Sequence, residues 1–180
     1  MEPLTVSLRA LRLAPLALLL PTASLAQAPA NLDAMIQDAM SAAPSTVAVN
    51  ATVMDWARNV LRQGSNGWTC FPAPPGKETG PMCLDASMAQ WADAWMNRKP
   101  VTTNRVGVAY MLQGDAGSSN TDPHATSPAA NNEWVVAGPH TMIFVPDASL
   151  LEGLPTDPGN GGPWVMWKGT PYVHIMVPVN

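Results

Sequence analysis

The chain lacks the sequence motifs that identify several large classes of enzyme. It has no His-Glu-x-x-His pair for zinc-dependent hydrolysis, no Gly-x-Gly-x-x-Gly or phosphate-binding loop, and no Gly-x-Ser-x-Gly turn. Ser118 and Ser119 follow Gly117, but a serine nucleophile needs a base placed beside it, and none is evident nearby. The sequence therefore does not name a reaction.

Charge is also scarce. Only 12% of the residues are charged, and Lys and Arg form no cluster. Without residues 1–28 the chain has 7 basic and 12 acidic side chains, a net charge of −5. Nucleic acids and anionic membranes are bound through basic patches. Neither is predicted as a partner, which leaves a small molecule or a metal ion.

The apolar run near the N-terminus, Leu13–Leu20, is far shorter than the ~20 residues of a membrane span. It follows Arg9 and Arg12 and precedes an Ala-Gln-Ala site at residues 26–28, as in a secretory signal. We predict a signal peptide at residues 1–28, cleaved near Ala28, and an exported protein that is periplasmic or secreted. Residues 29–44 would form an N-terminal helix or tail, and residues 45–180 a single domain.

Cysteine occurs only twice, as Cys70 and Cys83. Export would place them in an oxidising compartment, where a disulfide is the favoured state. The segment between them, residues 71–82, holds four prolines and two glycines, so neither a helix nor a central strand is expected there. A disulfide across it would stabilise the fold by ~3 kcal/mol. A redox or metal role would need a Cys-x-x-Cys spacing or a nearby histidine, and neither is present.

Three short apolar runs are predicted to pair as strands: Val106–Leu112, His140–Val145 and Tyr172–Val177. Alternate residues of a strand point to opposite faces of the sheet. One face then collects aliphatic side chains and is expected to be the core. The other collects two His-x-Met pairs, together with small residues and further apolar ones: Gly107, Ala109, Met111, His140, Met142, Phe144, Tyr172, His174 and Met176.

The clearest helix signal is Asp85–Arg98. Its apolar residues recur at helical spacing and form one stripe of Met88, Trp91, Ala92, Trp95 and Met96. Asp85 stands at the start, and Pro100 follows the end, as start and stop rules prefer. We expect this stripe to lie on the sheet.

The remaining signals are shorter. A helix capped by Asn31 is expected to end before Pro44, and Asp147 is expected to cap one or two helical turns. Strands are expected in the segments Thr52–Trp56, Val60–Gln63, Trp68–Phe71, Glu133–Ala137 and Trp164–Trp167, the first two as a hairpin. The order of elements predicts an α+β fold, with a mainly antiparallel sheet, one amphipathic helix packed on it and short additional helices.

The loop Gln113–Asn132 is long enough for a lid or a binding loop. Its ligand candidates are Asp115, Asn120, Asp122 and His124. Asp115, Ser118, Asn120 and Asp122 offer oxygen atoms of the kind that calcium binds, but their spacing is not that of an EF-hand. Ordinary turn chemistry accounts for the same residues, and for His124.

Five short segments carry a family pattern: residues 66–70 (Asn-Gly-Trp-Thr-Cys), 110–114 (Tyr-Met-Leu-Gln-Gly), 119–123 (Ser-Asn-Thr-Asp-Pro), 162–167 (Gly-Pro-Trp-Val-Met-Trp) and 169–172 (Gly-Thr-Pro-Tyr). They resemble a group of small exported bacterial proteins without an assigned activity. The resemblance extends over nearly all of the mature chain. It implies one intact domain and transfers no catalytic residue.

The His/Met face is the most specific chemical signal. Imidazole and thioether together favour copper, above all Cu(I). The candidate metal ligands are His140, Met142, His174, Met176 and Met111, and copper is the candidate cofactor. The function predicted first is therefore an exported protein that binds a soft metal or small ligand.

Two alternatives remain open. The same face could be a second hydrophobic core, in which methionines fill gaps against Trp91 and Trp95 and the protein has no site. It could also belong to a small enzyme, of hydrolase or lyase type, with His140 or His174 as general base. Asp115, Asp122 or Glu133 would then orient the base. If the strands pair with His140 opposite His174, the Cβ atoms of the two histidines would be ~5 Å apart.

Overall fold

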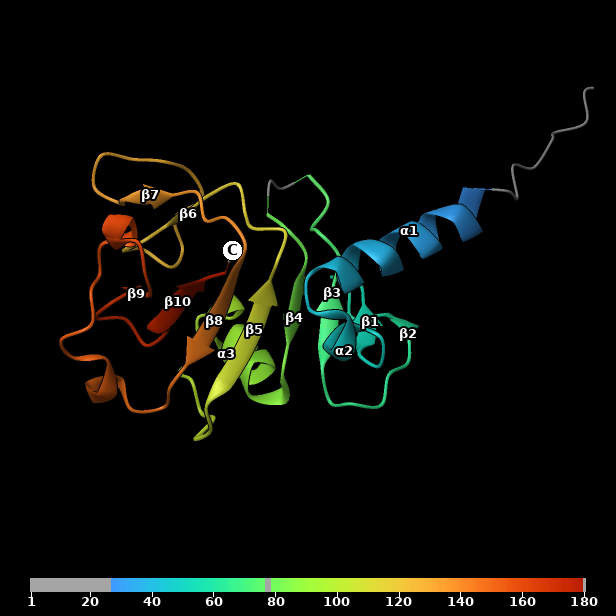
Figure 1. The fold of residues 1–180 in the computed structure, drawn as a ribbon, viewed down its shortest axis with the longest axis horizontal. Helices are drawn as coiled ribbons and strands as arrows, with labels where there is room; N and C mark the ends of the chain where they lie inside the picture. Colours follow the sequence, from blue (N-terminus) through green and yellow to red (C-terminus); the bar gives the residue numbers. More distant parts are fainter. Residues whose placement is uncertain (1–26, 77–78, 180) are drawn as a thin grey trace, which may run out of the picture.

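The structure, a computed structural model, describes residues 27–76 and 79–179. Its centre is an eight-stranded sheet in the order β2-β1-β3-β4-β5-β8-β10-β9 (Figure 1). Neighbouring strands run antiparallel, except that β1 and β3 are parallel. The strands are β1 Thr52–Met54, β2 Val60–Arg62, β3 Thr69–Phe71, β4 Met82–Leu84, β5 Gly107–Met111, β8 His140–Phe144, β9 Trp164–Met166 and β10 His174–Pro178.

The helix that packs on this sheet is α3, Ala86–Met96, and its packing confirms the predicted α+β class. Asp85 caps it, because one carboxylate oxygen accepts a hydrogen bond from the backbone N–H of Met88. The other oxygen accepts from the N–H of Val108 and so joins the helix start to β5. Met88 and Trp91 are buried against the sheet, as the apolar stripe predicts, whereas Met96 is 47% exposed.

The two cysteines lie directly opposite each other on β3 and β4 and form the predicted disulfide. The hairpin of β1 and β2 is also confirmed. No strand was predicted at β4, however, and the prediction that residues 71–82 take no part in a central strand is wrong at both ends. Phe71 closes β3, and Met82 opens β4 only one residue after Pro81. Three residues are enough for a central strand when both neighbours supply hydrogen-bonding partners.

The N-terminal helix α1 extends over Gln27–Ser41 and points away from the sheet (Figure 1). Its predicted start at Asn31 is wrong, because Asn31 already lies inside the helix; Pro29 is tolerated in a first helical turn, where its missing N–H costs no bond. Ala39 packs on the strands that carry the disulfide, and a four-residue helix α2, Ser45–Ala48, follows Pro44. The predicted signal peptide lies almost wholly outside the described residues.

The sheet face on which α3 packs, called the covered face below, is the one that carries the His-x-Met pairs. Leu84, Ala109, Phe144 and Met176 belong to its core cluster. The prediction that the aliphatic face is the core is therefore wrong. Alternation shows which residues share a face, but both sets are apolar, so it does not show which face receives the helix. Gly107 helps to decide it, since a Cβ atom there would lie 2.7 Å from the backbone nitrogen of Met88.

The opposite face, called the open face, is covered only at its ends. Its alternating residues are half-buried in the middle of the sheet, and Val106, which immediately precedes β5, is 55% exposed. Ala39 of α1 covers one end, beside the disulfide. Leu151, from the short 3₁₀ helix η1 (Ala148–Leu151), packs at the other end on Val165 of β9. Asp147 caps η1 as predicted.

The long loop Gln113–Asn132 carries a short strand of its own, β6 (Ser118–Ser119), paired with β7 (Trp134–Val135). A second 3₁₀ helix, η2 (Pro158–Asn160), precedes β9. Among the described residues, no helix is long and apolar enough to cross a membrane.

Candidate functional site

Both histidines of the covered face are almost fully enclosed. His140 is 1% exposed and His174 is 0% exposed. In each ring, Nδ1 lies within hydrogen-bond distance of the backbone carbonyl two residues earlier: 2.7 Å to Gly138 for His140 and 3.0 Å to Tyr172 for His174. A carbonyl oxygen only accepts, so Nδ1 must carry the proton. In the neutral ring Nε2 then has a free lone pair.

Neither Nε2 atom has a hydrogen-bond partner. Of the buried side-chain nitrogen and oxygen atoms in the part of the chain that the structure describes, only three are unpartnered: Nε2 of His140, Nε2 of His174 and Nε1 of Trp91. Buried polar groups are nearly always hydrogen-bonded, and an exception calls for a ligand, water, ion or functional role. The three exceptions therefore mark the covered face as the place to look for a site.

The two histidines share this face, as predicted, but they do not lie opposite each other. Met142 pairs with Met176, so His140 lies opposite Pro178, and His174 lies four residues further along β10. This is ~13 Å along the strand. The expected register is wrong because the argument for it excluded only a slip of one residue. A slip of two or four residues keeps every side chain on its own face.

The order along the face is therefore histidine, methionine, methionine, histidine. His140 and Met142 follow each other on β8, Met176 lies opposite Met142, and His174 follows on β10. The imidazoles still influence each other electrostatically, since His140 contributes to lowering the pKa of His174. The two ends of this row have different surroundings.

At the β8 end, sulfur and a carboxylate accompany His140. Met111 lies directly opposite it on β5 and is 4% exposed. Opposed residues of an antiparallel pair have Cβ atoms ~5 Å apart, so the side chains of Met111 and His140 are neighbours on the covered face. Burial raises the pKa of Asp115, while the neighbouring His140 and hydrogen bonds from the N–H groups of Ala137 and Gly117 act in the opposite direction.

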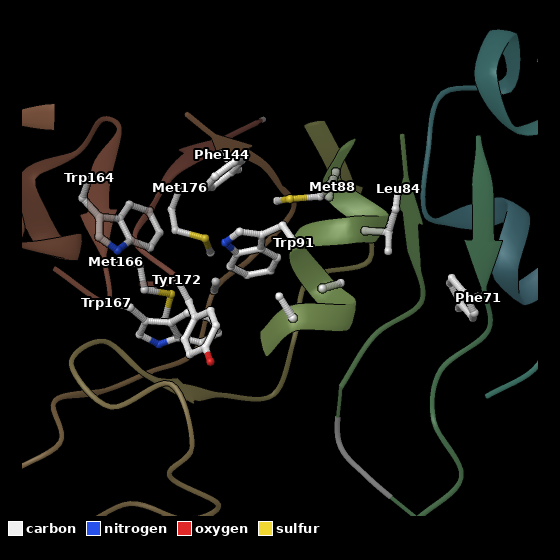
Figure 2. Packing of buried hydrophobic residues seen from close by; sticks show 14 residues of the cluster. Phe71, Leu84, Met88, Trp91, Phe144, Trp164, Met166, Trp167, Tyr172 and Met176 are labelled. Carbon is white, nitrogen blue, oxygen red and sulfur yellow. The ribbon is translucent and has the colours of Figure 1, made fainter. Parts of the chain in front are cut away.

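At the β10 end, aromatic rings enclose His174. Its ring lies edge-on to Trp91 and Trp167, with centroids 5.1 Å and 4.9 Å away. These two indoles stack with an interplanar angle of 10° (Figure 2). Burial lowers the pKa of His174 to about 4, with a further contribution from His140 and against the hydrogen bond to Tyr172. The ring is therefore neutral near pH 7.

A methionine next to His174 was missed. Met166 of β9 lies opposite His174 and is 2% exposed. The run Trp164–Trp167 is apolar at every position, because both faces of this strand are covered. Alternation therefore gave no indication that Met166 shares a face with the histidines.

The covered face is also the main hydrophobic core. This agrees with the alternative in which the methionines only fill space and the protein has no site. Met176 and Met88 pack in the same cluster as Trp91, which Figure 2 shows between them. Packing accounts for the methionines. It does not account for the two unpartnered imidazole nitrogens.

The loop candidates do not join this face as a group. Asp122 accepts a hydrogen bond from the backbone of His124, and the His124 ring lies edge-on to Tyr172 at 5.6 Å. Asp115 accepts bonds from its own loop and from Ala137. The candidates thus make separate contacts, and within residues 27–76 and 79–179 no three His, Cys, Asp or Glu side chains come together as a metal site.

Asn120 has a structural role that sequence reasoning missed. It is 3% exposed. Its amide nitrogen donates to Glu133 and to the carbonyl of Thr156, and its side-chain oxygen accepts from the indole of Trp164. Its backbone carbonyl accepts from the N–H of Trp167. The loop is thus fastened over β9, and Glu133 is engaged in this fastening instead of orienting a histidine.

Comparisons with protein-family models, curated proteins and solved structures give no match for this chain. The function must therefore be argued from the chemistry of the covered face.

Proposed function

We propose that this protein binds a soft metal ion of the Cu(I) type on the covered face, with His140 as the central ligand. The observation that carries the proposal is the buried Nε2 of His140, which has no hydrogen-bond partner and belongs to the residue directly opposite Met111. Met111 on β5 and Met142 on β8 are the proposed sulfur ligands, since both are neighbours of His140 on the covered face. Met176 and His174 continue the row on β10.

The chemistry of these donors selects the metal. Neutral imidazole and thioether bind Cu(I) well and bind magnesium or calcium poorly. The backbone carbonyl of Gly138 fixes the tautomer of His140, which is the usual arrangement for a histidine that ligates a metal through its other nitrogen. The carboxylate of Asp115 supplies negative charge near the ion. A metal ion also needs no open pocket, since it sits between its donor atoms.

The enzyme alternative uses the same imidazole as a general base, and access is the difficulty for it. His140 is 1% exposed, so an organic substrate could not reach its Nε2 without opening the fold. A surface depression of about 430 Å³ exists, but it is lined by Arg58, Asp93 and Lys99 and by other residues that include no histidine. A soft-metal site therefore fits the geometry better than a catalytic base.

The experiment is a Cu(I) titration of untagged protein against a chromophoric competitor, with the metal content of the purified protein measured in parallel. We expect one Cu(I) per chain. His140→Gln and Met111→Leu should each weaken binding by at least ~10-fold, the lower end of the effect of disturbing a metal site.

Matched controls exist in the same chain. His124→Gln removes the loop histidine, and Met96→Leu removes an exposed methionine of α3; both should leave the affinity unchanged. Protein that binds no Cu(I), or one in which His124→Gln weakens binding as much as His140→Gln, would refute the proposal.

We also propose that the protein is exported and cleaved near Ala28. The disulfide between Cys70 and Cys83 supports this, because such bonds persist mainly in oxidising compartments. The intact mass of the protein recovered from a bacterial periplasm or medium should correspond to a chain that begins close to residue 29. Full-length protein found only in the cytoplasm would contradict it.

A further inference from the structure

We infer that His174 and Trp91 form a second binding site, for a single hydroxyl oxygen in the form of a buried water molecule. Nε1 of Trp91 can only donate a hydrogen bond, and Nε2 of His174 can only accept one while Nδ1 is protonated. Both atoms are buried and unpartnered. A water molecule accepts from the first and donates to the second. This inference does not depend on the proposed metal site.

The two groups lie in one aromatic cluster. The ring centroids of Trp91 and His174 are 5.1 Å apart, and the planes are inclined by 71°. Figure 2 shows the indole nitrogen of Trp91 directed toward Met176. Met176 stands two residues after His174 on the same face of β10. The unpartnered donor of α3 thus points toward the strand that carries the unpartnered acceptor.

A bound metal ion would account for the unpartnered nitrogens of His174 and Trp91 less well than for that of His140. A cation at His174 would use the lone pair of Nε2 but would leave the N–H of Trp91 buried without a partner, which costs about 1–3 kcal/mol. A hydroxyl oxygen satisfies both atoms. The thioether of Met176 is a weak acceptor nearby. A water needs two to four polar partners to be held in an interior, and this cluster supplies them.

The close packing of the aromatic rings favours water over a larger ligand. Trp91 and Trp167 stack with centroids 5.8 Å apart, and His174 lies edge-on to both. All three side chains are at most 5% exposed. An organic alcohol offers the same hydroxyl chemistry but would have to separate this packing. The water joins α3 to β10 and fixes His174 as a neutral acceptor.

The test is nuclear magnetic resonance of the ¹⁵N-labelled protein, with exchange cross-peaks recorded between indole N–H protons and water. We expect the indole proton of Trp91 to show a direct cross-peak to a long-lived water. The matched controls lie in the same spectrum, since the indoles of Trp164 and Trp167 donate to Asn120 and to the carbonyl of Ser119 and should show none.

Trp91→Phe keeps a buried ring and removes the donor, so it should abolish that one cross-peak. If this variant does not fold, contacts of the indole proton with Met176 in the unsubstituted protein identify the resonance. A cross-peak to an organic hydroxyl, detected together with a bound molecule in the native mass spectrum, would replace water by an alcohol and overturn the size argument. No cross-peak at the Trp91 indole proton would overturn the inference altogether.

Discussion

The two faces of the sheet are built from alternate residues of the same strands and yet differ in almost every property. The covered face is enclosed by α3 and contains His140 and His174, the three buried tryptophans and the unpartnered nitrogens. The open face is half-buried in its middle and is closed only at its ends. In the part of the chain that the structure describes, the unpartnered buried nitrogens are thus found on the face that excludes water.

The largest effect that this comparison predicts is at Trp91. Trp91→Ala removes a side chain that is 2% exposed and should lower the free energy of unfolding by ~3–5 kcal/mol. Val106→Ala on the open face is the matched control. Val106 is 55% exposed, so a change within ~0.5 kcal/mol is expected. Denaturant unfolding measures both, and equal losses would show that the two faces contribute alike.

The disulfide should have the next largest effect, because it stabilises the otherwise thinly covered open face. Cys70 and Cys83 are 0% exposed and pack with Ala39 of α1. Replacing both cysteines by alanine should cost ~3 kcal/mol, the loop-closure value for this spacing. Urea unfolding of the double variant and of the oxidised parent gives the difference. A loss below ~1 kcal/mol would mean that α1 and the strands hold this region without the bond.

The pH dependence distinguishes the faces through His174. Its pKa falls from 6.5 in the unfolded chain to about 4 in the fold. Between these values the unfolded chain binds a proton that the folded protein does not, so stability is lost as pH falls from 6.5 to about 4 and the loss is complete below that. The total is about 3 kcal/mol, at ~1.4 kcal/mol per unit.

This dependence is measured on protein kept metal-free with a chelator, as the difference between the parent and His174→Gln. The subtraction removes the carboxylates, including Asp115, whose raised pKa acts with the opposite sign. If stability changed with pH equally in parent and variant, the pKa of His174 would be the same in the folded and the unfolded chain, which would contradict the prediction.

The smallest predicted effect concerns how closely α3 approaches the sheet. Gly107→Ala would place a Cβ atom 2.7 Å from the backbone nitrogen of Met88 and 3.0 Å from its Cα, so the helix must shift, at a cost of ~1–3 kcal/mol. Gly138→Ala is the control, because a Cβ atom there meets nothing within 4 Å. Thermal unfolding compares the two, and a neutral Gly107→Ala would mean that α3 can move at little cost.

Sequence reasoning performed well where a pattern is local. The helix with its Asp85 cap, the central strands and the sharing of one face by His140 and His174 all follow from periodicity and turn residues. It failed where the answer depends on a partner distant in the chain. The pairing of Met142 with Met176 is set by contacts between strands. A slip of two residues would leave the pattern of apolar and polar residues on each face unchanged, so the sequence does not reveal it.

The wrong prediction of which sheet face forms the core also arose from a contact between distant parts of the chain. The core face depends on where α3 settles, and the close approach at Gly107 becomes visible only in three dimensions. Met166 and β4 were missed because a strand of three residues that is covered on both faces, or that follows a proline, carries too little pattern to be recognised.

The position of β10 has a consequence for the order in which the protein can assemble. This strand lies between β8 and β9, although both precede it in the chain. A growing polypeptide that has reached Trp167 therefore contains both neighbours but not the strand that joins them. The row from His140 to His174 comes into existence only when residues 174–178 insert between β8 and β9. Until that strand is in place, β8 has one edge without a partner strand, although every other strand of the sheet has already been made.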